Sequence, residues 1–391
     1  MALLGGRKKE EIIAVIDLGS ASVGGMLIKK TAKSGQEIIT STRVPINFLM
    51  DVDFQAFWRC AVNSLNKVMS QLLKDYPKGP DKVLCAFSHL WVISQTRVIK
   101  VKKNEKFKID KNFLDKIIEN EIKTFKIQGQ TQIASLKENV ELVEYKIMRT
   151  SLNGYNVENP FDKWTKRFSA YVHMSLIDNS IKKTLQESFL KNFGDVTIEF
   201  RTMPFIIFSI LKNLDKIDEG FLFLDIGGET SDISLVRRNV LEETISFPRG
   251  KNFLIRKVAS AFKTFVDDAI SILNSYQNNQ ISPAILEKLI PIIEFAKKEW
   301  NDYLEKTMQE LSRELPLPKK ILVVSNTSVF EEFVQGVKNE SLAKFTILSK
   351  PFELERISAE ALKDHFIFKR NINVDNDVFL MLESIFADKF L

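Results

Sequence analysis

The chain has 391 residues, 45% of them hydrophobic and 27% charged, and this balance excludes an intrinsically disordered protein. Its net charge of +6 comes from scattered lysines among 50 acidic residues, which argues against a nucleic-acid-binding protein and leaves open a weak attraction to an anionic membrane surface. The two cysteines lack metal or disulfide spacing and no apolar run reaches about 18 residues, so we expect a cytoplasmic protein of two or three domains without a membrane span.

The first predicted element is a strand over residues 12–16, which are all apolar and which Asp17 follows directly. A turn of small residues comes next, and residues 23–28 predict the strand that returns from it. A buried carboxylate without a partner is strongly destabilising, so we expect Asp17 to stand at the end of the strand and to face a ligand.

The next part of the chain predicts a small α+β unit. Residues 82–103 alternate apolar and polar side chains as a pair of strands does, and residues 140–176 predict strand, turn and strand. Between them, residues 107–125 predict a helix because four apolar side chains stand at helical spacing: Phe113, Ile117, Ile118 and Ile122.

A second unit with the same order of apolar strand, aspartate and turn begins near the middle of the chain. Residues 221–224 predict a buried strand, Asp225 ends it, and residues 227–231 form a turn of glycines and small polar residues. Residues 232–236 predict the returning strand and residues 240–247 a third strand. The chain therefore carries two hairpins in which an aspartate follows a buried strand and precedes a glycine turn.

The two aspartate–glycine hairpins have residues suited to binding phosphate together with Mg²⁺. Glycines bring backbone N–H groups close to an anion, and an aspartate holds Mg²⁺, usually through water. Two such loops that face each other would clamp a polyphosphate, whereas the alternative is a pair of ordinary hairpins. Neither loop is a Walker loop or a dinucleotide fingerprint. The candidate metal residues are Asp17 and Asp225, and the candidate phosphate-binding residues are Gly19, Ser20, Ser22, Gly227, Gly228 and Thr230.

The last third of the chain predicts helices around one more strand. Residues 266–315 predict helices with a break near Pro291, and residues 321–324 predict a strand. Residues 376–391 have one apolar face, but their polar face is acidic where a membrane-surface helix carries lysine and arginine. We therefore expect the final helix to belong to the core.

In this order the two hairpins resemble the two phosphate loops of the actin, sugar kinase and Hsp70 superfamily. The segment between them resembles the inserted subdomain of the FtsA family of bacterial cell-division proteins, and the PilM family of type IV pilus assembly proteins shares this insertion. The residues that fall in that pattern are Asn153, Gly154, Asn159, Pro160 and His173.

The resemblance implies an α/β protein with a two-lobed, actin-like (duplicated ribonuclease H-like) fold and a small α+β inserted subdomain. The first lobe then comprises residues 8–80 and a return over 181–219, and residues 81–180 form the inserted, SHS2-like interaction subdomain. Residues 220–357 form the second lobe with a helical insert at about 264–316, and residues 358–391 pack back on the first lobe.

The resemblance also implies binding of ATP with Mg²⁺, and at most a slow ATPase because no catalytic base is evident. The superfamily places a glycine pair against the adenosine, and this chain has Ser325 and Asn326 at that position. We name both as candidate nucleotide-binding residues, and it stays open whether this half of the site binds adenosine.

Two partner hypotheses follow from the resemblance. In the first, an FtsA-like protein self-associates under nucleotide control and links a tubulin-like division-ring protein or other divisome components to the cytoplasmic face of the inner membrane, with indirect or weak membrane contact and no nucleic acid. In the second, a PilM-like scaffold binds the cytoplasmic peptide of a pilus membrane protein in a groove of the inserted subdomain. A small-molecule kinase is disfavoured, because the inserted subdomain replaces the usual substrate-binding elements.

Overall fold

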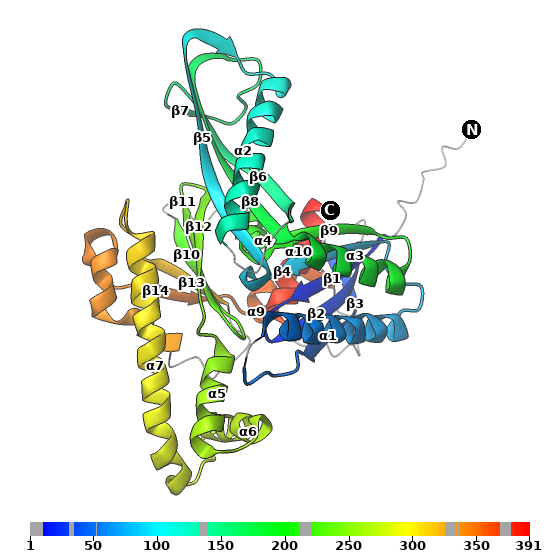
Figure 1. Ribbon diagram of the computed structural model, residues 1–391, viewed down its shortest axis with the longest axis vertical. Helices are drawn as coiled ribbons and strands as arrows, with labels where there is room; N and C mark the ends of the chain where they lie inside the picture. The colour runs from blue at the N-terminus through cyan, green and yellow to red at the C-terminus, as the bar shows by residue number, and fades with distance from the viewer. Residues whose placement is uncertain are drawn as a thin grey trace.

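The structure is a computed structural model that describes residues 11–30, 35–51, 53–132, 139–211, 220–324, 333–334, 336–367 and 377–391. Within these residues no helix is both long and apolar enough to cross a lipid bilayer. The described elements form three sheets of six, five and four strands (Figure 1).

The six-stranded sheet forms the first lobe, in the order β15-β3-β2-β1-β4-β9. β1 lies inside this sheet, and its apolar run is buried on both faces. Its strands are β1 (Glu11–Leu18), β2 (Ser22–Lys30), β3 (Gln36–Pro45), β4 (Lys82–Phe87), β9 (Thr197–Thr202) and β15 (Phe366–Ile367).

Helices cover both faces of this sheet. One face packs against α1 (Phe54–Asp75) and α3 (Asn179–Phe193), which share a core with Ile12, Ala14 and Ile16. The other face packs against α4 (Met203–Leu211), α9 (Ala359–Leu362) and α10 (Val378–Phe390). The final helix of the chain, α10, is buried over residues 380–387 and contacts β1, β2 and α4.

The position of β4 corrects one expectation. Residues 82–103 do not form a strand pair, because β4 lies in the first lobe and pairs in parallel with β1 and β9. The following strand, β5, belongs to the four-stranded sheet. Apart from Lys82, β4 is a continuous apolar run, KVLCAF, that is buried from Val83 onward, whereas β5 mixes apolar and polar side chains. Their long-range partners, β1 for β4 and β8 for β5, place them in different sheets.

The four-stranded sheet, in the order β5-β8-β6-β7, projects from the two lobes at the top of Figure 1. One helix, α2, packs on it, with Leu114, Ile118 and Phe125 against Phe168 and Val172. The elements are β5 (Val92–Lys108), α2 (Lys111–Gln132), β6 (Val140–Leu152), β7 (Tyr155–Val157) and β8 (Trp164–Asp178).

The five-stranded sheet forms the second lobe, in the order β12-β11-β10-β13-β14. Its strands are β10 (Phe221–Ile226), β11 (Ser231–Arg237), β12 (Val240–Phe247), β13 (Lys320–Val324) and β14 (Glu353–Arg356). Its helices are α5 (Lys251–Phe262), α6 (Val266–Gln277) and α7 (Pro283–Leu311). Short 3-10 turns are η1 (His89–Trp91), η4 (Gly336–Lys338), η5 (Glu340–Phe345), η6 (Ile347–Ser349) and η7 (Lys363–His365).

The predicted break at Pro291 is wrong, since α7 runs through it as one helix. A proline inside a helix removes one backbone hydrogen bond, and packing on both sides of it offsets that loss. Leu289 and Ile293 flank Pro291 and are both buried, and Trp300 and Leu304 continue the same face into the core of the second lobe.

Candidate functional site

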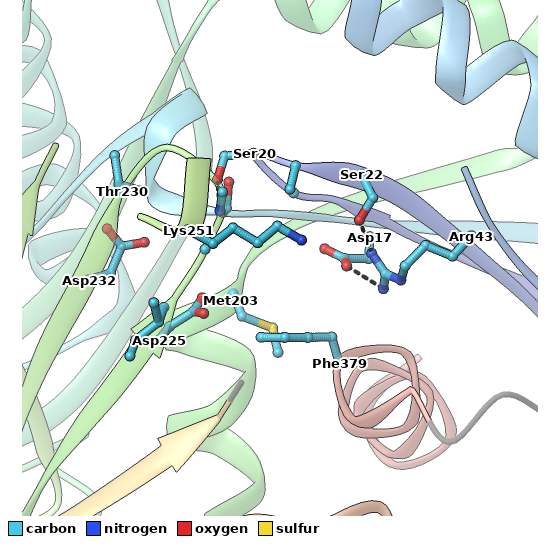
Figure 2. A pocket seen from close by; sticks show the side chains of 16 residues that line it. Asp17, Ser20, Ser22, Arg43, Met203, Asp225, Thr230, Asp232, Lys251 and Phe379 are labelled. Atoms are coloured by element: carbon cyan, nitrogen blue, oxygen red, sulfur yellow. Dashed lines mark hydrogen bonds and ion pairs between the residues drawn. The ribbon is translucent and has the colours of Figure 1, made fainter. Parts of the chain in front are cut away.

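The two glycine hairpins meet at a cavity of about 250 Å³ between the lobes (Figure 2). The β1–β2 turn and the β10–β11 turn touch directly, because the Ser20 hydroxyl accepts hydrogen bonds from the Gly228 N–H at 2.9 Å and the Glu229 N–H at 3.2 Å. The structure therefore brings the two predicted loops together, and the cavity is lined by Asp17, Gly19, Ser20, Ser22, Asp225, Gly227, Gly228 and Thr230.

The glycines of the second loop are required by this contact. A Cβ atom on Gly228 would lie 2.6 Å from both the Ala21 Cβ and the Ser20 carbonyl oxygen, and one on Gly227 would lie 2.9 Å from the Ser20 hydroxyl oxygen. A heavier side chain would hold the loops apart. In this conformation the glycines let one loop approach the other.

A lysine that the sequence reasoning missed projects into the cavity. Lys251 is the first residue of α5, and its side chain points toward Asp17 (Figure 2). Its backbone N–H donates to the Gly227 carbonyl at 3.0 Å, so the second loop positions it. Burial, together with the neighbouring Arg43, lowers the pKa of Lys251 from its ordinary value. The signal in the sequence was a lysine directly after Gly250, just beyond the predicted strand over residues 240–247.

Asp17 lies in an ion-pair network that connects three parts of the chain. Its Oδ2 accepts from Arg43 Nη2 at 2.7 Å, Arg43 Nη1 donates to the Ser22 hydroxyl at 2.9 Å, and Arg43 Nε pairs with Asp377 at the start of α10. Burial raises the pKa of Asp17, and Arg43 opposes that rise. Arg43 and Asp377 were missed because they lie on β3 and before α10, far from either motif in the sequence.

Asp225, unlike Asp17, has a buried carboxylate oxygen without a hydrogen-bond partner among the described residues. The residue is 7% exposed, and this oxygen is Oδ1. Burial raises the pKa of Asp225 well above its ordinary value, and the neighbouring Asp232 and Asp17 add to the rise. A cation beside this carboxyl would oppose that rise by stabilising the charged form. The described residues contain no cluster of three or more His, Cys, Asp or Glu side chains suited to a metal by themselves.

Glu229 points away from the cavity. Arg256 donates to both of its carboxylate oxygens, at 2.7 and 2.8 Å, and the Asn252 amide donates to one of them at 2.7 Å. Arg256 also donates to the Leu49 carbonyl at 3.0 Å, which ties the second lobe to the first. Glu229 is thus a structural link between the lobes and has no free oxygen for ordering a water in the cavity.

A second cavity of about 440 Å³ adjoins the first and shares Ala21 and Lys251 with it. It lies between the segment after β3 and helices α5 and α6, and apolar residues such as Ile46, Phe48 and Ile255 line it. The two candidate adenosine residues, Ser325 and Asn326, lie outside the described residues.

A third cavity, of about 610 Å³, is a groove along the edge of the inserted sheet. β6 pairs with β8 along its length but with β7 only over residues 150–152, so the edge at residues 142–148 has no neighbouring strand in the described structure. Those seven residues form one wall. The opposite wall consists of aromatic side chains from α4 and α10: Phe205, Phe208, Phe386 and Phe390.

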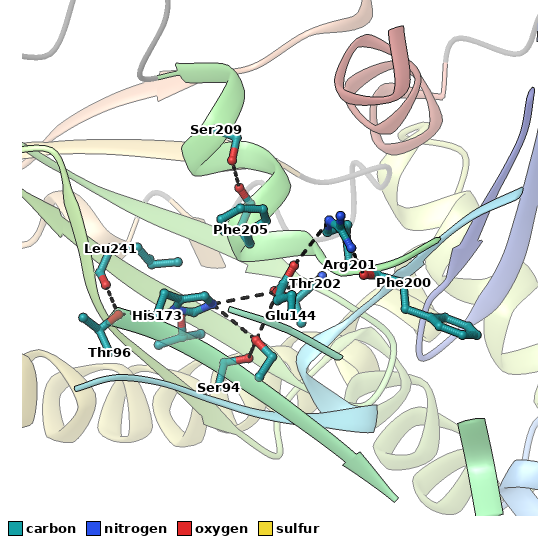
Figure 3. Close-up of polar contacts among 12 residues, drawn as sticks. Ser94, Thr96, Glu144, His173, Phe200, Arg201, Thr202, Phe205, Ser209 and Leu241 are labelled. Carbon is teal, nitrogen blue, oxygen red and sulfur yellow. Dashed lines mark hydrogen bonds and ion pairs between the residues drawn. The ribbon is translucent and has the colours of Figure 1, made fainter. Parts of the chain in front are cut away.

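A buried polar network lies at the base of this groove (Figure 3). Glu144 accepts hydrogen bonds from the Thr202 N–H and hydroxyl and from the Ser175 hydroxyl. Burial raises the pKa of Glu144 to about 7, although Thr202 and the nearby Arg201 act in the opposite direction. Burial lowers the pKa of His173 to about 3, so that this histidine is neutral.

Helices α4 and α10 connect the cleft with the groove. Met203 at the start of α4 and Phe379 at the start of α10 line the cavity between the hairpins. Farther along the same helices, Phe208 and Phe386 line the groove, and the two helices contact each other. A shift of either helix therefore changes the walls of both cavities.

Comparison with known proteins yields structural neighbours only, since no protein-family model and no curated protein matches the sequence. The solved structure of a PilM–PilN type IV pilus biogenesis complex covers 95% of this chain and 97% of its own, at 13% identity with a TM-score of 0.62. A Bacteroides thetaiotaomicron protein with an actin-like ATPase fold and unknown function covers 91% and 94%, at 11% identity and 0.41. A MamK double helical filament covers 97% and 99%, at 10% identity and 0.48.

At this level of identity the likeness to the PilM–PilN structure shows the fold. The chain has the two-lobed, actin-like α/β fold with an inserted α+β subdomain, and the predicted fold class is confirmed.

Proposed function

We propose that this protein is a PilM-like adapter that holds an extended peptide of a partner in the groove beside β6. The main support is the groove itself, a cavity of about 610 Å³ that is lined by an unpaired strand edge and by four phenylalanines. An extended peptide adds to such an edge through main-chain hydrogen bonds, and its alternate side chains enter the pocket opposite. The likeness to a PilM–PilN complex supports this choice of partner class.

The cleft between the hairpins fits a magnesium-bound polyphosphate such as that of ATP. Lys251 supplies a cation for phosphate, and the unpartnered Oδ1 of Asp225 supplies an acceptor for a water of the magnesium shell. When bound, the metal would neutralise phosphate charge. Asp17 has the same proposed role, but it must first part from Arg43.

Phosphate binding in this cleft is linked to lobe opening. The Gly228 and Glu229 amides, which are the anion donors expected of the second loop, bind the Ser20 hydroxyl in the present structure. A phosphate takes these amides only if Ser20 withdraws. We therefore propose that nucleotide separates the two loops, and that nucleotide is a conformational signal in this protein.

The FtsA-like hypothesis, in which the partner is a tubulin-like division-ring protein, shares the fold and the cleft and differs in the partner. We rank it second because a pilus biogenesis complex is among the structural neighbours, with a TM-score of 0.62. Purification of the intact protein from its own cells with identification of its bound partner separates the two. A pilus membrane protein supports the adapter, and a division-ring protein supports the alternative.

The groove is tested with fluorescent peptides that cover the cytoplasmic segment of the captured partner. Phe390→Asp places a charge in the groove, where Phe390 is already 47% exposed, and we expect at least tenfold weaker binding by anisotropy. Phe265→Asp is the matched control, because Phe265 is 84% exposed and directly precedes α6, which lies far from β6, α4 and α10 in Figure 1. Equal affinity of both variants and the parent protein would contradict the proposed site.

A further inference from the structure

The far end of the inserted sheet combines features that neither the cleft nor the groove uses. We define the tip as residues 102–111 and 153–167, where β5 ends, β6 turns into β7 and β8 begins. These segments are neighbours, since Lys102 pairs with Arg167 and Lys108 with Trp164 in the β5–β8 register. The tip lies at one end of the longest axis of the molecule, away from both lobes (Figure 1).

Three large aromatic side chains are exposed at the tip. Tyr155 is 79% exposed, Trp164 is 62% exposed and Phe161 is 41% exposed. Isolated exposed apolar residues are normal on a protein surface, but these three aromatic residues fall within ten consecutive positions at one protruding end. Trp and Tyr in particular favour the boundary between lipid and water, because each has an apolar body and a polar group.

The same tip is strongly basic. It carries eight lysine or arginine residues, all exposed, against four acidic residues, a balance of +4 where the whole chain has +6. One of the eight, Lys108, forms an exposed ion pair with Asp162 at 2.7 Å, and Lys103 lies over the ring of Phe107. Lys166 and Arg167 follow Trp164 on β8, and both are exposed, with no ion pair among the described residues. The tip therefore carries +4 of the net charge of +6 of the whole chain, in the same two segments as the exposed aromatic residues.

We propose that the tip of the inserted sheet is a docking surface for anionic lipid bilayers. Basic side chains are attracted to the negative surface of such a bilayer, and Trp164, Tyr155 and Phe161 then enter its headgroup region. The tip protrudes, so a flat surface can reach it without touching either lobe (Figure 1). A nucleic acid would instead need a basic stripe along a groove, and the tip is a compact end.

The fluorescence of Trp164 gives a direct test. Trp91 and Trp300 are buried and Trp58 is half-buried, so Trp164, at 62%, is the most exposed of the four tryptophans. The intact protein is mixed with vesicles of phosphatidylcholine alone or with about one third phosphatidylglycerol, each with and without brominated acyl chains. We expect quenching by brominated anionic vesicles, at least tenfold weaker binding to the neutral vesicles, and loss of binding as salt rises.

Three variants complete the test by vesicle co-sedimentation. Trp164→Ser removes the aromatic anchor, and Lys166→Glu with Arg167→Glu reverses charge at the tip; we expect each to weaken binding at least fivefold. The control variant carries Lys78→Glu and Phe265→Ser, which alter an exposed lysine and an exposed aromatic residue elsewhere, and it should bind like the parent protein. Melting temperatures of all variants verify that the fold is intact.

Two outcomes would overturn the proposal. One is vesicle binding that the control variant loses as strongly as the tip variants do, because the attraction would then be a general effect of net charge. The other is an unquenched Trp164 together with salt-sensitive binding of duplex DNA that the tip variants lose, which would assign the same surface to a nucleic acid. The proposal does not depend on the peptide groove, whose variant Phe390→Asp should bind vesicles normally.

Discussion

At the scale of single residues, the site depends on which buried carboxyls have partners. Asp17 is held by Arg43, whereas Asp225 has an oxygen without a hydrogen bond among the described residues. Both follow a buried strand in the sequence, and their motifs are alike. The difference comes from Arg43 and Asp377, which the fold brings to one of them. The assignment of magnesium to the two aspartates stays a prediction.

The first prediction concerns Asp225→Asn. A neutral amide of the same shape removes the cost of burying this carboxyl, so we expect the ligand-free protein to gain about 1–3 kcal/mol of unfolding free energy at neutral pH. The rise in melting temperature caused by ATP with Mg²⁺ should disappear, because the acceptor for the metal's water is lost. Thermal unfolding with and without ligand measures both effects. A variant that keeps the full ligand-induced rise would remove Asp225 from the site.

The second prediction concerns the pH dependence conferred by Glu144. Its pKa is about 7 in the folded protein against an ordinary value of 4.5, so the folded state binds a proton more tightly and the wild type loses stability as pH rises between these values. The Glu144→Gln variant has a neutral amide at this position and no carboxyl that could ionise. Relative to the wild type it should gain up to about 3 kcal/mol between pH 4.5 and pH 8.

Urea unfolding of both proteins at several pH values measures this difference. The titratable neighbour His173 does not interfere in this window, because burial lowers its pKa to about 3. The charged neighbour is Arg201, whose Nε lies 3.9 Å from Glu144 Oε2. The remaining contacts, from Ser175 and Thr202, are uncharged. Parallel stability curves for the two proteins would show that Glu144 is ionised throughout.

At the scale of elements, the direct contact between the two hairpins occupies the backbone amides that a phosphate in the cleft would use. Gly228 is its tightest point, because Ala21 and Ser20 of the other hairpin leave no room for a Cβ atom. The N-terminus of α5 completes the arrangement by donating its first N–H groups to the Gly227 and Gly228 carbonyls. The β10–β11 hairpin and α5 are therefore tied to each other, and we expect them to stay together when the facing hairpin separates from them.

The third prediction is that Gly228→Ala separates the hairpins. The added methyl group meets backbone and Cβ atoms at 2.6 Å, so we expect a loss of about 1–3 kcal/mol and faster exchange of the Glu229 amide hydrogen. Hydrogen exchange and urea unfolding measure these changes. Gly154→Asn is the control, since its Cβ meets nothing within 4 Å and any loss of stability there comes from the positive φ of 94° and leaves the Glu229 amide unaffected. Equal exchange in both variants would mean that the loops are already apart in solution.

At the scale of the whole molecule, α4 and α10 extend from the cleft to the groove. Their first residues line the cavity between the hairpins, and their later residues line the groove beside β6. A helix moves as a rigid rod, so a change at one of its ends reaches the other. We therefore expect the cleft and the groove to be coupled through these two packed helices.

The fourth prediction follows from this coupling. Saturation of the groove with the partner peptide should change the affinity for ATP with Mg²⁺ about fivefold or more, and by reciprocity the nucleotide should change the peptide affinity by the same factor. Calorimetric titrations in both directions measure the two factors. Phe390→Asp, which blocks the groove, should have no such response. Identical nucleotide affinities with and without bound peptide would show that the two sites are independent.

Local patterns in the sequence were sufficient for the elements themselves. The apolar runs before Asp17 and Asp225 indicated buried strands, and glycines after them indicated the tight turns, because a strand and its hairpin depend on neighbouring residues. Together with the resemblance, these two units also led to the fold class. The proline in α7 was the exception, since packing on the second lobe, which lies far away in the sequence, outweighs the local break.

Tertiary structure alone decided which residues meet. The Arg43 network joins β1, β3 and α10, the groove joins β6, α4 and α10, and the basic aromatic tip joins the ends of β5 and β8 with the turn after β6. These sets are dispersed in the sequence, and no periodic pattern marks them. The sequence by itself determined two aspartate–glycine hairpins, because local rules specify them, whereas the contact between these hairpins arises only when the two lobes fold against each other.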